Sequence, residues 1–64
     1  MNKFKENLSL YRKQIGITQG KLASQLGVTE GSVRHWEKGR TEPDIDTLLK
    51  LCKILKVSIE ELLL

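Results

Sequence analysis

The chain has 64 residues, with 11 lysines and arginines, 8 acids and a formal net charge of +3 at pH 7. This length fits one domain, residues 1–64, which buries only about 60% of its unfolded surface. No apolar run reaches the roughly 18 residues of a membrane-spanning helix. The first residues, MNKFKENL, also lack the apolar stretch of a signal peptide. We therefore expect a single cytoplasmic domain with no membrane partner.

Positive charge is concentrated in the first part of the chain. Residues 1–40 hold eight lysines and arginines against three acids, which is a net charge of +5. Residues 41–64 hold three lysines against five acids, which is a net charge of −2. A polyanion is expected to meet the positive part. By itself the overall charge is compatible with ordinary solubility, so the motifs have to decide the partner.

The first helix is predicted over about residues 3–14, and Gly16 is expected to end it because glycine tolerates a positive φ. Apolar residues recur at helical spacing along this segment and predict a face directed at the core. These residues are Phe4, Leu8, Tyr11 and Ile15.

Two short helices joined by a tight turn are predicted within the stretch QGKLASQLGVTEGSVRHWEK, residues 19–38. Thr18 and Thr29 are the expected N-caps, and Gly27 and Gly39 are the expected stops. The earlier helix of this pair, residues 19–26, has an apolar face of Leu22, Ala23 and Leu26. The second, from Glu30 to about Lys38, has a face of Val33 and Trp36. Helices this short, joined by so tight a bend, must cross steeply, so the second projects from the domain.

The remaining chain predicts two further helices after a loop from Arg40 to Pro43. Asp44 or Asp46 is expected to cap the fourth helix. Its predicted apolar stripe consists of Ile45, Leu48, Leu51, Cys52 and Leu55. Ser58 is expected to cap a short last helix, with Glu61 completing a capping box. The chain therefore predicts an all-α fold.

Motifs spread along almost the whole chain occur in a characteristic order. They are Arg12, Ile15-Gly16-Ile17-Thr18-Gln19, Leu22-Ala23, Leu26-Gly27-Val28, Val33, Trp36-Glu37-Lys38-Gly39-Arg40, Pro43, Leu55-Lys56-Val57-Ser58 and Glu60-Glu61-Leu62-Leu63. A lone Leu-Ala-x-x-Leu-Gly would be weak evidence, but the complete series at these spacings is specific. By these motifs the chain resembles the phage-repressor-type helix-turn-helix family (lambda-repressor-like, Cro or XRE type). The resemblance implies a compact five-helix bundle that binds DNA through its third helix.

The resemblance places base-reading residues at the start and middle of the third helix. They are Thr29, Glu30, Gly31, Arg34 and His35. Glu30 can accept from cytosine N4, His35 can donate to guanine, and Arg34 can reach guanine or a phosphate. Many members of the family carry Gln or Ser at the first two reading positions, so Glu30 and Gly31 are departures. The alternative for each residue is a hydrated surface position.

Phosphate contacts are expected on both sides of this helix, from Gln19, Ser32, Lys38 and Arg40. The resemblance implies that the Gln19 amide clamps a phosphate beside the free N–H groups of its helix N-terminus. A solvated first-turn residue is the alternative for Gln19. For Lys38 and Arg40 the alternative is a favourable position near the C-terminal dipole of the third helix.

Three further residues are expected to be structural. The resemblance implies an internal ion pair between Arg12 and Glu37, which would tie the first helix to the third. Trp36 lies on the apolar face with Val33, so we expect it in the core and not stacked on a base. Cys52 is expected to be buried and inert. One cysteine with one histidine cannot form a zinc site, so no metal and no cofactor are expected.

The prediction is a sequence-specific double-stranded DNA-binding transcriptional regulator of the repressor type. One helix reads about half a site, so we expect a homodimer on a pseudo-palindromic duplex, with dimerisation weak or absent in free solution. Apolar residues among 57–64 that the core does not take could form the dimer contact. The alternative is an antitoxin that also binds a protein, although antitoxins usually carry an extra segment. No nucleophile–base pair, phosphate loop or carboxylate cluster is visible, so no catalytic residue is expected.

Overall fold

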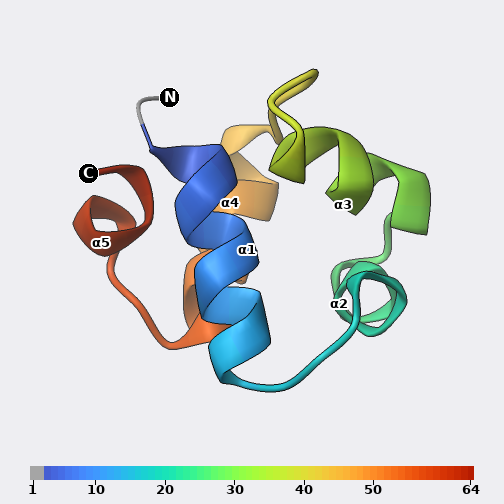
Figure 1. Ribbon diagram of the computed structural model, residues 1–64, viewed down its shortest axis with the longest axis horizontal. Helices are drawn as coiled ribbons and strands as arrows, with labels where there is room; N and C mark the ends of the chain where they lie inside the picture. Colours follow the sequence, from blue (N-terminus) through green and yellow to red (C-terminus); the bar gives the residue numbers. More distant parts are fainter. Residues whose placement is uncertain (1–2) are drawn as a thin grey trace.

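Five α-helices make up the computed structural model, which describes residues 3–64 and has no strand within them. They are α1 (Phe4–Gln14), α2 (Gln19–Leu26), α3 (Glu30–Glu37), α4 (Ile45–Leu55) and α5 (Ile59–Leu63). In Figure 1, α1 runs through the middle, with α5 on one side and α2 and α3 on the other. The Cα atoms span 24 × 23 × 20 Å. The predicted all-α, five-helix fold is confirmed.

Local hydrogen bonds set where four of the helices begin. The side chains of Thr18, Thr29, Asp44 and Ser58 each accept a hydrogen bond from the backbone N–H three residues on. At α5 the Glu61 carboxylate also accepts from the Ser58 N–H at 2.9 Å, so the capping box is complete. Each cap satisfies a backbone donor that the helix itself leaves unpaired, which explains the agreement between predicted and observed starts.

The core lies where all five helices meet. Its buried apolar residues are Phe4, Leu8, Leu22, Ala23, Leu26, Val33, Trp36, Leu48, Leu51, Leu55 and Leu62. Trp36 is only 5% exposed, as expected for a core residue. Leu62 is completely buried, whereas Leu64 is 74% exposed. The last helix therefore contributes one side of its short apolar run to the core.

Two predicted core positions are wrong, and a third is only partly right. Ile15 is 42% exposed because it lies in the non-helical cap after α1, where the helical spacing no longer applies. Ile45 is 67% exposed because it occupies the first position of α4, before the turn that reaches the core. Cys52 is half-buried and packs against the edge of the core.

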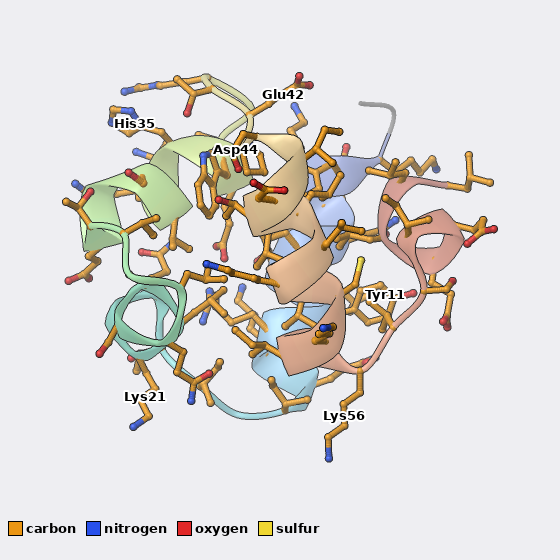
Figure 2. All side chains as sticks on the ribbon, turned by 180° about the vertical axis from the view of Figure 1, so that it is seen from behind. Tyr11, Lys21, His35, Glu42, Asp44 and Lys56 are labelled. Carbon is orange, nitrogen blue, oxygen red and sulfur yellow. The ribbon has the colours of Figure 1, made fainter. Side chains whose placement is uncertain are left out.

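Hydrogen bonds from α1 hold α5 on the side away from α2. The Asn7 side-chain amide donates to the carbonyls of Glu61 and Leu62, both at 3.1 Å. The Tyr11 hydroxyl donates to the Glu61 carbonyl at 3.4 Å, and Figure 2 shows this ring directed toward α5. These bonds pair carbonyls that the end of so short a helix leaves open. With α5 on that side, the outer faces of α2 and α3 remain uncovered.

Candidate nucleic-acid interface

A tight turn joins α2 to α3 and directs α3 outward. Gly27 adopts φ +74°, and the Val28 N–H donates to the Ala23 carbonyl at 3.0 Å, which closes the end of α2. Val28 is half-buried against the core, and Thr29 starts α3 immediately afterwards. The turn therefore contains only two residues before the next N-cap. Its shortness fixes α3 relative to α2, as a helix-turn-helix requires.

The outer side of α3 carries an exposed polar ridge. Glu30, Arg34 and Lys38 follow one another at four-residue spacing, and all three are exposed. His35 is half-buried beside the ridge, and Figure 2 shows it on the outside of α3, away from α1 and α4. Val33 is completely buried on the opposite side. One face of α3 is thus fixed in the core while the other is open to a ligand.

Two glycines on this surface are each covered by a charged side chain of α3. A Cβ placed on Gly20 would lie 3.4 Å from Glu30 Oε1, so the Glu30 carboxylate rests against the first turn of α2. A Cβ placed on Gly31 would lie 3.4 Å from Arg34 Nη2. The missing side chain at Gly31 therefore does not leave an empty gap, because the Arg34 guanidinium lies over it. Arg34 and Glu30 are the two charged residues expected to read bases.

Thr29 and Ser32 use their hydroxyls on each other. Thr29 Oγ1 accepts from the Ser32 N–H at 3.1 Å, and the two hydroxyl oxygens lie 3.0 Å apart in a hydrogen bond. Both residues lie at the N-terminal end of α3, the end that follows the turn from α2. The assignment of Thr29 to a base contact and of Ser32 to a phosphate contact stays a prediction.

Arg12, Gln19 and Glu37 meet in one hydrogen-bonded network behind α3. Arg12 Nε donates to Glu37 Oε2 at 2.6 Å, and Arg12 Nη2 donates to Glu37 Oε1 at 3.2 Å. Gln19 Nε2 donates to the same Oε1 at 3.0 Å, and Arg12 Nη1 donates to the Ile17 carbonyl at 2.8 Å. The side chains of Arg12 and Glu37 are only 10% and 8% exposed.

This network brings together residues that the sequence analysis treated separately. The expected phosphate ligand, Gln19, uses one amide hydrogen on Glu37 and keeps the other hydrogen and its oxygen. Glu37 thereby orients the Gln19 amide as well as holding α1 to α3. No sequence signal distinguishes a glutamine that is anchored in this way from one that is freely solvated.

A basic corner forms where α1 passes the end of α3; we use this name for Lys5, Lys38 and Arg40. Lys38 is the C-cap of α3, and Arg40 lies exposed beyond Gly39. A Cβ placed on Gly39 would lie 2.9 Å from Lys5 Cδ and 3.7 Å from Lys5 Nζ. From the sequence Lys5 contributes only to the net charge, because nothing in the pattern of α1 places it beside the end of α3.

Two ionisable groups away from this surface have shifted pKa values. Hydrogen bonds from the side chain and backbone N–H of Thr47 lower the pKa of the Asp44 carboxyl, which caps α4. Burial raises the pKa of the Cys52 thiol. Within residues 3–64 no group of three or more histidines, cysteines and acids is placed to hold a metal ion. No helix in this part of the chain is long and apolar enough to cross a membrane.

Comparisons with known proteins agree with this geometry. The helix-turn-helix family matches residues 8–62. The uncharacterized HTH-type transcriptional regulator YqaE of Bacillus subtilis is 43% identical over 60 residues, which cover 94% of this chain and 52% of that protein. The chain spans about half the length of the curated relatives it matches.

Solved structures with the same fold include a repressor and part of an enzyme. The c2 repressor of Salmonella phage P22, crystallised with a synthetic operator, superposes with a TM-score of 0.88 at 35% identity, covering 94% of this chain and 91% of that one. The hydroxypropylphosphonic acid epoxidase from S. wedmorenis superposes with a TM-score of 0.89 at 33% identity, covering 98% of this chain and 34% of that one. The fold alone therefore does not define an activity. The family match and the similarity to phage repressors together show that this chain belongs to the phage-repressor-type helix-turn-helix family.

Proposed function

We propose that the protein is a sequence-specific double-stranded DNA-binding transcriptional regulator of the repressor type. The observation that carries this proposal is the exposed ridge of Glu30, Arg34 and Lys38 on a helix whose other face is buried. A major groove is wide enough to admit such a helix, and charged ends at this spacing reach base edges and phosphates. The similarity to a repressor crystallised with its operator supports the same mode.

In this mode α3 reads bases while its surroundings hold the DNA backbone. Glu30, Arg34 and His35 supply the base contacts, assisted by Thr29, and the Arg34 guanidinium lies over Gly31. Phosphate contacts come from Gln19, Ser32, Lys38 and Arg40, which lie before, along and beyond α3. Glu37 holds the Gln19 amide in a fixed orientation, so less conformational freedom is lost when a phosphate binds. None of the comparisons above favours the antitoxin alternative.

The experiment that tests this function begins with selection of bound duplexes from a random pool. We expect an enriched sequence that the wild-type protein binds more tightly than a shuffled duplex. The double variant Arg34→Ala, His35→Ala should lose most of this preference, because each good base contact contributes about 1–3 kcal/mol of discrimination. Lys53→Ala, on the exposed side of α4, is the control that also removes one positive charge. Wild-type preference in a folded double variant would refute the assignment of these two residues.

We also propose that two copies bind one site, because one α3 reads only about half of it. The selected sequences should then be pseudo-palindromes whose halves lie about one helical turn apart. In free solution the copies should separate, since Val57, Ile59 and Leu63 pack against the core and only Leu64 of the apolar residues in 57–64 is strongly exposed. Sedimentation of the free protein at micromolar concentration should show a monomer. A tight dimer there would contradict weak association.

A further inference from the structure

The position of Lys5 on Gly39 suggests a role that neither the motif pattern nor the family match assigns. Lys5 belongs to the first turn of α1, while Gly39 follows the C-cap of α3. Gly39 has φ +75°, and its missing side chain leaves space for the Lys5 stem, whose Cδ would be 2.9 Å from a Cβ there. Any larger residue would displace the stem. The Lys5 stem therefore lies over Gly39, which places its ammonium group beside the start of the α3–α4 loop.

The Lys5 ammonium group does not stabilise the fold through a polar contact with another described residue. Among residues 3–64, no hydrogen bond or ion pair partner is found for the Lys5 ammonium group. Three carbonyls of the last turn of α3 already accept from backbone donors: Arg34 from the Lys38 N–H at 3.1 Å, His35 from the Arg40 N–H at 2.9 Å and Trp36 from the Gly39 N–H at 3.1 Å. Lys5 is thus not needed to complete the end of α3, although its charge is favourable there.

We propose that Lys5 is a DNA phosphate contact, and that the basic corner of Lys5, Lys38 and Arg40 binds one stretch of sugar-phosphate backbone. The three residues come from α1, the end of α3 and the following loop. A helix lying in the major groove has a phosphate strand passing its C-terminal end, and cations fixed there meet it without reading sequence. This inference rests on the proposed function and extends the DNA contact to α1.

Lys5→Met tests the proposal, because methionine keeps an apolar stem over Gly39 and removes the charge. One lost phosphate contact lowers the slope of log affinity against log salt by about 0.9. The same slope predicts affinity losses of about fivefold at 0.15 M salt and about fifteenfold at 0.05 M salt. The losses should be equal on the selected duplex and on a shuffled duplex of the same length, since the contact carries no sequence information.

Two further variants separate charge from packing. Lys5→Arg keeps a positive charge on a long stem and should retain the wild-type slope. Lys53→Met makes the same charge change near the far end of α4 and should also leave the slope unchanged. Circular dichroism of each variant establishes that the compared proteins are folded.

The possible outcomes distinguish a failure of the Lys5 phosphate contact from a failure of the proposed DNA-binding function. If the wild-type protein prefers the selected duplex but Lys5→Met has the wild-type salt slope, Lys5 contacts no phosphate and the proposed function still stands. A loss confined to the selected duplex, or an equal loss in Lys5→Arg, would overturn the phosphate role in favour of base reading or packing. If the wild type binds no duplex at all, the proposed function fails and the role of Lys5 fails with it.

Discussion

Replacing Glu37 by alanine should destabilise the fold severely, because this carboxylate is the common acceptor of the network behind α3. Its two oxygens accept from Arg12 Nε at 2.6 Å, Arg12 Nη2 at 3.2 Å and Gln19 Nε2 at 3.0 Å. In Glu37→Ala these donors lose their partner. The Arg12 guanidinium, with its side chain 10% exposed, keeps only its bond to the Ile17 carbonyl.

The expected cost follows from leaving one charge of a buried pair alone, which is about 3–5 kcal/mol. A chain of this size has a total free energy of unfolding of about 3–10 kcal/mol. The variant should therefore lose at least about 30% of its stability. With a urea dependence of about 1 kcal/mol per molar, the unfolding midpoint should fall by about 3 M or more.

Urea unfolding followed by two signals measures this change. Far-UV circular dichroism reports the helices, and the fluorescence of the single tryptophan, Trp36, reports the core in which it is 5% exposed. Glu6→Ala, an exposed glutamate of α1, is the matched control and should change the free energy of unfolding by less than about 0.5 kcal/mol. An unfolding midpoint of Glu37→Ala equal to that of the wild type would refute the structural role of the network.

A companion variant distinguishes the buried charge from the contact itself. Arg12→Met combined with Glu37→Leu replaces the ion pair by apolar groups and should recover much of the lost stability, since no unpaired charge remains. It also removes the acceptor that orients Gln19. We therefore expect this folded double variant to bind DNA more weakly than the wild type. Recovery of stability with wild-type DNA affinity would show that Gln19 needs no anchor.

Two other predictions follow from the shifted pKa values. Because hydrogen bonds from Thr47 lower the pKa of Asp44 in the folded state, its stabilising effect is present above the unfolded value and is lost as the pH falls through the folded one. The urea midpoint of the wild type should therefore drop more between about pH 5 and about pH 2 than that of Asp44→Asn, which caps α4 without titrating; parallel profiles would contradict this. Burial raises the pKa of the Cys52 thiol, so iodoacetamide should alkylate the folded protein more slowly than the urea-unfolded chain at neutral pH, and equal rates would show an accessible thiolate.

The sequence by itself determined the helices, most of the core and the family. Thr18, Thr29, Asp44 and Ser58 each cap a helix by bonding to a group three residues away, so the short-range sequence contains the whole interaction. The apolar stripes are equally local, since helical spacing places their members on one face. That reasoning failed at Ile15 and Ile45 because both lie at helix ends, Ile15 in the cap after α1 and Ile45 at the first position of α4, where helical spacing does not decide burial.

Only the tertiary structure decided how the charged residues of the interface are held. Gln19 and Glu37 are 18 positions apart, and their hydrogen bond requires α2 and α3 to have already crossed. Lys5 reaches Gly39 only because α1 passes the end of α3, and the contact depends on the absence of a Cβ at that point. Side-chain type and spacing predict which residues face outward. The partner of a long, flexible charged side chain depends instead on which distant backbone the fold brings within its reach.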